Sequence, residues 1–230
     1  MKSYIPNFIT LLNLFSGCVA VIFALEGNMM WTALFVCLGI FFDFFDGLLA
    51  RKLNVQSELG LQLDSLADMV TSGLVPGLVL FHLLGLAQQP SWESISILPY
   101  FGLLVTLASA YRLAKFNIST NQSDAFIGLP TPANALLIIS LPLIVEYQNS
   151  TLLDAVILNP WFLLGITVLS CYLLNAPVKL IALKFKTWGF KANIPRYLLI
   201  LLSVTLLAIF QFAGIPLIIV GYIIVSMFSK

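Results

Sequence analysis

The sequence predicts an all-α polytopic membrane protein, a bundle of about eight transmembrane helices (six to eight) with both termini in the cytoplasm. Of its 230 residues, 60% are hydrophobic and only 9% are charged, and the mean hydropathy is +1.02. This composition excludes an ordinary soluble domain. Apolar stretches recur along the chain at lengths close to the roughly 20 residues that span a bilayer. The expected spans are 8–25, 29–49, 62–86, 96–116, 131–147, 160–176, 196–212 and 214–228, of which the fifth, sixth and eighth are short.

The distribution of charge supports this count and sets the orientation. If the N-terminus is cytoplasmic, all basic residues fall on the cytoplasmic side, as the positive-inside rule requires. These residues are Lys2, Arg51, Lys52, Arg112, Lys115, Lys179, Lys184, Lys186, Lys191, Arg196 and Lys230, and the external loops then carry only Glu26, Glu93, Glu146 and Asp154. The net charge of +1 gives no support for nucleic-acid binding.

The first expected span has one polar face. Asn7, Thr10, Asn13 and Gly17 follow one another at spacings of three, three and four, and Pro6 suits a helix start. Such a face either hydrogen-bonds to neighbouring helices or lines a substrate site, and the spacing leaves both interpretations open.

The segment 43–68, which joins the second and third spans, carries four aspartates. Asp43 and Asp46 share one helical face, and Asp64 and Asp68 share another. Two unit charges about 4 Å apart repel by roughly 4 kcal/mol at an effective dielectric near 20, so such a group requires protons or cations. Carboxylate oxygens suit Mg²⁺ or Mn²⁺, and paired divalent ions are a known device for phosphoryl transfer. The segment therefore predicts a site for two divalent ions.

The alternative is that these carboxylates only cap helices or pair with Arg51 and Lys52. The surrounding FFDFFDGLLA run implies lipid or packed protein, where carboxylates are costly and usually functional. This favours the metal site. In the same third span, Pro76 predicts a kink well past the aspartates. The cysteines Cys18, Cys37 and Cys171 stand singly in apolar stretches and predict buried thiols rather than disulfides.

The residues of this segment follow a pattern of two blocks. The first block is D-x-x-D-G-x-x-A-R, and eight residues separate it from the second block, G-x-x-x-D-x-x-x-D. It resembles the motif of the CDP-alcohol phosphotransferase family at every position, namely Asp43, Asp46, Gly47, Ala50, Arg51, Gly60, Asp64 and Asp68. The resemblance implies an integral membrane enzyme whose aspartates bind two metal ions and which transfers a phosphatidyl group from a CDP-linked lipid to an alcohol, releasing CMP. It favours nucleotide and diphosphate binding for Gly47, Ala50, Arg51 and Gly60, although spacing alone allows the glycines to serve helix packing.

The segment 111–135 carries a second pattern. Arg112 and Lys115 share a face at the cytoplasmic end of the fourth span, where position alone does not separate snorkelling to headgroups from ligand binding. The segment resembles the R-L-A-R-F-N and G-L-P-x-P-A blocks of the phosphatidylserine synthases of the family, and the P-N-x-x-T-x-x-N run resembles their start. Lys115 replaces the usual arginine and loses its bidentate geometry. The resemblance implies a lipid-phosphate or serine site formed by Asn7, Thr10, Arg112, Lys115 and Asn117.

These features predict one integral membrane catalytic domain, 1–230, with a motif core at 5–135 and scaffold or dimerisation helices at 136–230. The expected reaction is phosphatidyl transfer from CDP-diacylglycerol to L-serine, with Asp68 as general base. The expected site faces the cytoplasm in the plasma or inner membrane, among membrane lipids. The family resemblance alone implies a homodimer. Two alternatives stay open. In the first, the acceptor is another alcohol, such as glycerol 3-phosphate or an inositol phosphate. In the second, the protein is a cation-coupled transporter, although transporters commonly show inverted repeats and none is visible in this sequence.

Overall fold

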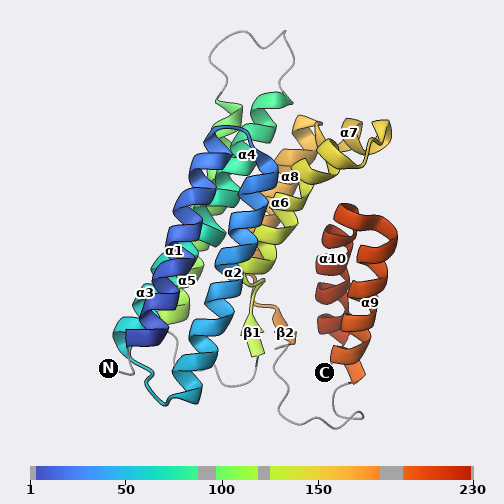
Figure 1. Cartoon of the computed structure of the whole chain (residues 1–230). Coiled ribbons are helices and arrows are strands. Elements are labelled where there is room, and N and C mark those ends of the chain that lie inside the picture. The colour runs from blue at the N-terminus through green and yellow to red at the C-terminus, as the bar shows by residue number, and fades with distance from the viewer. Residues whose placement is uncertain (1–3, 88–96, 119–124, 182–193, 229–230) are drawn as a thin grey trace.

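Helices make up almost all of the structure, a computed structural model that describes residues 4–87, 97–118, 125–181 and 194–228 (Figure 1). Its elements are α1 (Tyr4–Leu25), α2 (Met29–Lys52), α3 (Glu58–Asp68), η1 (Met69–Leu74), α4 (Val75–Leu86), η2 (Leu98–Leu103), α5 (Leu104–Ile118), β1 (Ala125–Ile127), α6 (Thr131–Tyr147), α7 (Thr151–Ile157), α8 (Pro160–Asn175), β2 (Lys179–Ile181), α9 (Ile194–Phe210), η4 (Gln211–Ala213) and α10 (Gly214–Phe228). The strands β1 and β2 pair antiparallel, with Phe126 opposite Leu180. The prediction of a helical membrane protein is confirmed, and this short strand pair is an addition to it.

The expected count of eight spans is not confirmed by length and composition. Within the described residues, four helical tracts are long and apolar enough to cross a membrane: Tyr4–Leu25, Met29–Lys52, Glu58–Leu86 and Tyr197–Ser226. The pair α7 and α8, bent by 61°, adds a fifth if it counts as one span. Helix α6 has 17 residues, and at 1.5 Å per residue it is shorter than the roughly 30 Å hydrocarbon core. Of the charges used for the orientation, Lys2, Lys184, Lys186, Lys191, Lys230 and Glu93 lie outside the described residues.

The last apolar tract, Tyr197–Ser226, is a hairpin of two helices. Gly221 of α10 lies so close to α9 that an added Cβ would be 3.1 Å from the Leu202 side chain. The turn is at η4, where Gln211 has a positive φ of 49°. The start of α1 and the end of α10 therefore lie at the same end of the molecule (Figure 1).

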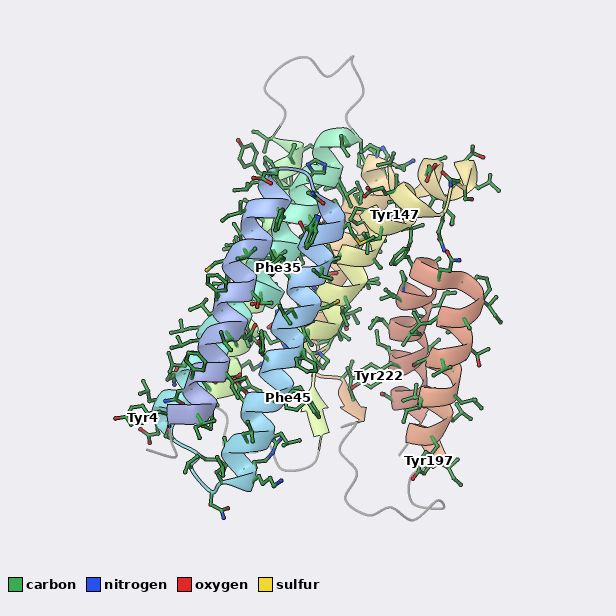
Figure 2. All side chains as sticks on the ribbon, in the orientation of Figure 1. Tyr4, Phe35, Phe45, Tyr147, Tyr197 and Tyr222 are labelled. Atoms are coloured by element: carbon green, nitrogen blue, oxygen red, sulfur yellow. The ribbon has the colours of Figure 1, made fainter. Side chains whose placement is uncertain are left out.

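The bundle has an apolar interior and an apolar exterior. One buried cluster, including Val36, Val79 and Leu83, joins α2 to α4, and a second includes Leu137, Leu199 and Ile219 of α6, α9 and α10. Many large apolar side chains project outward, as Figure 2 shows, and this is expected of surfaces that face lipid. Cys18 and Cys37 lie exposed on this outer surface and Cys171 is half-buried. The prediction of buried thiols was wrong for the first two, because an apolar span has a lipid face as well as a packed one.

The third span contains a π-helical turn just before Pro76, the residue at which the sequence predicts a kink. Proline lacks the N–H that an α-helix would bond to the residue four positions earlier. The π-helical turn η1 (Met69–Leu74) precedes this point, and Glu58–Leu86 continues as one tract of 29 residues. Such turns often occur at functional sites. Here η1 begins directly after Asp68 and places Thr71 against α1 and α2.

The close packing of η2 on α4 gives a test of the fold. A Cβ added at Gly102 would lie 2.6 Å from Phe81 N and 2.8 Å from the Leu80 carbonyl carbon. These main-chain atoms cannot turn aside, so Gly102→Ala is expected to destabilise the protein by about 1–3 kcal/mol and to lower its Tm in detergent. Gly85→Ala on α4 is the matched control, because no atom of the described residues lies within 4 Å of its added Cβ. Equal Tm values for the two variants would contradict this packing.

Candidate active site

A short, well-capped connection between α2 and α3 builds the site. Asn54 adopts a left-handed conformation with φ 53°, which asparagine tolerates better than most residues. The amide of Val55 then donates to the Ala50 carbonyl oxygen at 3.0 Å. Ser57 caps α3 by accepting a hydrogen bond from Gly60 N at 3.1 Å. The chain therefore reverses within a few residues, and α3 returns packed against α1.

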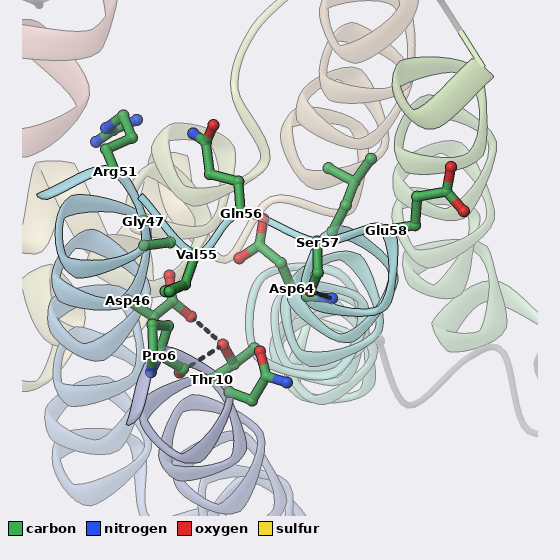
Figure 3. Close-up of a pocket in the computed structure, with 14 residues that line it drawn as sticks. Pro6, Thr10, Asp46, Gly47, Arg51, Val55, Gln56, Ser57, Glu58 and Asp64 are labelled. Atoms are coloured by element: carbon green, nitrogen blue, oxygen red, sulfur yellow. Dashed lines mark hydrogen bonds between the residues drawn. The ribbon is translucent and has the colours of Figure 1, made fainter. Parts of the chain in front are cut away.

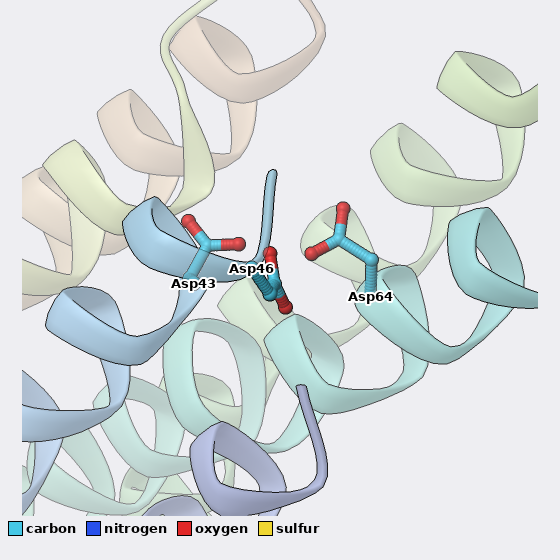
Figure 4. Close-up of side chains that lie close together, drawn as sticks. All are labelled: Asp43, Asp46 and Asp64. Atoms are coloured by element: carbon cyan, nitrogen blue, oxygen red, sulfur yellow. The ribbon is translucent and has the colours of Figure 1, made fainter. Parts of the chain in front are cut away.

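This reversal brings three carboxylates together. One oxygen from each of Asp43, Asp46 and Asp64 lies within 4.8 Å of the other two (Figure 4). Oδ1 of Asp64 is buried and accepts no hydrogen bond within the described part of the chain. A buried, unsatisfied carboxylate oxygen is costly unless a cation meets it. The donor set, all hard oxygen, fits Mg²⁺ or Mn²⁺.

Asp68 is not one of the three carboxylates whose oxygens lie within 4.8 Å of one another, although its charge still acts on Asp43. It lies one turn further along α3, is 9% exposed, and its Oδ1 accepts a hydrogen bond from Asn13 Nδ2 of α1 at 3.2 Å. The sequence predicts four carboxylates aimed at one point. The structure groups three of them and directs the fourth toward α1.

The spacing of the polar residues of α1 allows them either to line a substrate site or to hydrogen-bond to neighbouring helices, and the structure shows some of them at a cavity and others in helix contacts. Thr10 Oγ1 donates to Asp46 Oδ2 at 2.5 Å (Figure 3). Asn7 and Thr10 also line a cavity beside the carboxylates. Asn13 and Gly17 lie deeper and contact η1 at Thr71. The first half of the face therefore lines the site, and the second half packs helices together.

The cavity has a volume of about 430 Å³. Its walls come from α1, the end of α2, the connection and the start of α3, and are lined by Pro6, Asn7, Thr10, Asp46, Gly47, Ala50, Arg51, Val55, Gln56, Ser57, Glu58, Gly60, Leu61 and Asp64. The structure thus brings together every residue assigned to the nucleotide and diphosphate. The connection residues Val55, Gln56 and Ser57 were missed, because no pattern in the sequence shows that this segment folds over the aspartates.

The two motif glycines differ in how much space surrounds them. Among the described residues, a Cβ at Gly47 would have only Arg51 Nη2 nearby, at 3.9 Å, so packing within this part of the chain does not require glycine there. A Cβ at Gly60 would approach Ser57 Oγ at 3.2 Å and Asn7 Oδ1 at 3.3 Å. Gly47 therefore leaves open space in the cavity, whereas Gly60 permits α3 to approach α1 closely.

The comparison with known families agrees with this geometry. The family model described as CDP-alcohol phosphatidyltransferase matches residues 3–169. The chain belongs to this family. That assignment confirms the resemblance seen in the aspartate motif and makes the chain a member of a family of membrane transferases.

Relatives within the family carry one recurring name. A CDP-diacylglycerol–serine O-phosphatidyltransferase of Bacillus subtilis is 38% identical over 134 residues, which cover 56% of this chain and 70% of the relative. A protein of the same name from Helicobacter pylori strain J99 is 35% identical over 136 residues, covering 58% and 55%. One from Methanocaldococcus jannaschii is 30% identical over 166 residues, covering 72% and 71%. The chain thus matches little more than half the length of the H. pylori relative.

The family-specific residues of α5 lie outside the cavity lining. Arg112 is 9% exposed and donates from Nη1 to the Leu174 carbonyl oxygen at the end of α8, at 2.7 Å. Gly128, with a φ of 75°, lies against this pair, and its added Cβ would be 2.8 Å from Nη1. Asn117 accepts a hydrogen bond from Ser65 Oγ at 3.0 Å and donates one to Gln62 Oε1 at 3.1 Å. The oxygen and the nitrogen of its side-chain amide therefore both contact α3. Arg112 and Asn117 thus join helices, while Lys115 is exposed.

This placement predicts a structural effect for Arg112→Lys. A lysine keeps the charge but loses the fork of N–H donors, and loss of a buried charged hydrogen bond costs about 1–3 kcal/mol. The Tm is expected to fall while the KM for the acceptor alcohol changes little. Lys115→Arg, an exchange at an exposed position of the same helix, is the control and should leave the Tm unchanged. A raised acceptor KM with an unchanged Tm would show instead that Arg112 binds a ligand.

Proposed function

We propose that the protein transfers the phosphatidyl group of CDP-diacylglycerol to L-serine, forming phosphatidylserine and releasing CMP. One observation carries this proposal. Asp46 and Asp64 belong both to the carboxylate trio and to the wall of the 430 Å³ cavity. A metal-binding group thus opens directly onto a space of the size that small ligands occupy, as transfer from a nucleotide diphosphate requires.

The cavity provides the groups that a CDP moiety needs. Arg51 offers a planar fork of donors suited to a phosphate group. Gly47 leaves room for a ligand to approach the backbone of α2. Asn7, Gln56 and Ser57 add amide and hydroxyl groups to the same wall. We therefore assign Gly47, Ala50, Arg51 and Gly60 to the nucleotide and diphosphate.

The aspartates are assigned to two divalent ions, Mg²⁺ or Mn²⁺, with Asp43, Asp46 and Asp64 as one group and Asp68 completing the set. When bound, such ions neutralise charge on the diphosphate and on the departing phosphate of CMP. Thr10 holds Asp46 in place through its hydrogen bond. Asp68 accepts the proton of the serine hydroxyl while the serine oxygen forms a bond to the lipid-linked phosphorus. The bond between that phosphorus and the CMP oxygen breaks, and CMP leaves.

Serine is the proposed acceptor. The relatives from Bacillus, Helicobacter and Methanocaldococcus have names that specify serine, and a relative from Methanothermobacter thermautotrophicus, 28% identical over 148 residues, is named archaetidylserine synthase. A phosphorylated acceptor such as glycerol 3-phosphate calls for more cationic partners than Arg51, the single basic residue among those described as lining the cavity. Lys115, exposed at the end of α5, is assigned to the lipid phosphate or the serine carboxylate.

We further propose a cell-membrane orientation with eight crossings, both termini in the cytoplasm and the site on that side. The start of α1, the end of α10 and helix α3, which carries Asp64 and Asp68, lie toward one end of the molecule (Figure 1). Arg51 and Lys52 lie in the last turn of α2 at this end, in agreement with the positive-inside rule. The exposed apolar faces of α9 and α10 are assigned to lipid or to a second copy in a homodimer.

An acceptor screen tests the reaction. Purified protein with CDP-diacylglycerol, L-serine and Mn²⁺ or Mg²⁺ is expected to release CMP and to form phosphatidylserine, identified by mass spectrometry of the lipid. A chelator should stop the reaction, and added metal should restore it. Product with glycerol 3-phosphate or an inositol phosphate but not with serine would change the acceptor. Cation uptake into proteoliposomes without CMP release would support a transporter instead.

A further inference from the structure

Behind the cavity, three side chains form a continuous hydrogen-bonded chain. Thr71 Oγ1 of η1 donates to Asn13 Oδ1 of α1 at 2.8 Å, and Asn13 Nδ2 donates to Asp68 Oδ1 at 3.2 Å. Asn13 and Thr71 are both 0% exposed. Neither is among the residues that line the cavity. Asp68 is not among these lining residues either, so all three side chains lie behind the cavity wall, next to Asp64 on α3.

Two glycines make room for this chain. A Cβ at Gly17 of α1 would collide with Thr71 Oγ1. A Cβ at Gly39 of α2 would lie 2.6 Å from Thr71 Cγ2 and 2.8 Å from Asn13 Oδ1. The threonine and the amide are thus closely enclosed between α1 and α2. Small residues serve close helix packing in membranes, and here the packing encloses polar groups.

The order of donors along the chain fixes the direction of the amide. A hydroxyl has one hydrogen, and that of Thr71 is directed to the oxygen of the Asn13 side chain. The amide nitrogen must then face Asp68, where its N–H meets a carboxylate oxygen. If the amide turned over, its oxygen would face the carboxylate and repel it. Thr71 therefore supports the orientation in which Asn13 presents its N–H to Asp68, and Thr71 is not itself a residue of the cavity wall.

We propose that Asn13 and Thr71 are positioning residues for Asp68, holding its carboxylate in the orientation that accepts the proton of the attacking hydroxyl. This inference rests on the proposed phosphatidyl transfer. It assigns to the second half of the α1 polar face a role in the chemical step, separate from nucleotide binding by the first half.

Thr71→Val tests the proposal, because valine keeps the shape of the side chain and removes the hydroxyl. The expected result is a kcat about 10- to 100-fold lower, the range that corresponds to loss of a buried hydrogen bond. The KM for CDP-diacylglycerol and the affinity for CMP in the presence of Mn²⁺ should stay unchanged, because the cavity wall is intact. Thr71→Ser restores the donor and should return kcat to within about threefold of the wild type.

The control is Thr167→Val in α8. Thr167 is equally buried at 1% exposed, and its hydroxyl donates at 2.8 Å to the Leu163 carbonyl oxygen of its own helix. Thr167→Val makes the same chemical change at a residue that has no hydrogen-bonded link to Asp68. The kcat of this variant should therefore equal that of the wild type. Similar Tm values for the two valine variants would show that the lower kcat of Thr71→Val does not come from unfolding.

Asn13→Ala provides a second variant from the α1 side. Thr71 Oγ1 also lies 3.2 Å from the main-chain oxygen of Asn13, so this hydroxyl keeps a partner when the side chain is removed. The same fall in kcat is expected. Wild-type activity in Asn13→Ala, equal impairment of Thr71→Ser and Thr71→Val, or a parallel loss of CMP affinity would each overturn the positioning role. Absence of CMP release by the wild-type protein would overturn the proposed function instead.

Discussion

Asp43→Asn is expected to abolish CMP release and, in metal-free protein, to raise the Tm. Asp43, Asp46 and Asp64 have oxygens within 4.8 Å of one another. At about 4 Å and an effective dielectric near 20, each ionised pair repels by roughly 4 kcal/mol. Asparagine removes one ionisable group from this cluster with almost no change of shape, so the folded state no longer bears its repulsion or the proton uptake that relieves it. Because the same charge helps to hold the ions, turnover should fall by about 10³-fold or more.

The measurement is a pair of thermal unfolding curves, one with chelator and one with Mn²⁺, beside the CMP assay. Wild-type protein should gain stability from Mn²⁺, because a ligand that binds only the folded state stabilises it. Asp43→Asn should start from a higher Tm and gain little. Glu146→Gln, at an exposed position beyond the site, is the control for loss of one negative charge and should show neither effect. A lower metal-free Tm in Asp43→Asn would mean that the carboxylate has a favourable partner in the folded protein.

Most helices could be placed from hydropathy, and the exceptions have identifiable causes. The expected span 131–147 coincides with α6 (Thr131–Tyr147). The third span begins earlier than expected, at Glu58, because the Ser57 cap adds a turn that is not apolar. The β1–β2 pair joins segments more than 50 residues apart, and no local pattern in the sequence reports such a pairing. The π-helical turn η1 also depends on tertiary contacts of Thr71 with α1 and α2.

The candidate site was predictable where spacing alone decides which side chains share a face. Asp43 and Asp46, three apart on α2, meet Asp64 as expected. Spacing does not describe how α3 is rotated against α1, so the separation of Asp68 from the trio could not be foreseen. For the same reason, Arg112 was grouped with ligand-binding residues, whereas its contact with Leu174 depends on the placement of α8, 62 residues away.

Asp68→Asn is expected to abolish turnover while it spares the fold and much of the metal binding. The Oδ1 of an asparagine at this position can still accept the hydrogen bond from Asn13 Nδ2, so the link to α1 is kept. The trio of Asp43, Asp46 and Asp64 remains complete. What is lost is the group that accepts a proton, because a neutral amide oxygen is too weak a base for that role.

The contrast between the two aspartate variants separates the metal-binding group from the base. Asp68→Asn should retain a substantial Mn²⁺-induced rise in Tm and wild-type affinity for CMP, whereas Asp43→Asn should lose most of that rise. Both should be inactive, so only the binding measurements distinguish them. Loss of Mn²⁺ stabilisation in both variants would place Asp68 within the principal metal group, and near-normal turnover in Asp68→Asn would remove it as the base. Because Asp68 is hydrogen-bonded to Asn13 and is not one of the three carboxylates within 4.8 Å of one another, its replacement should disturb metal binding less than the replacement of Asp43.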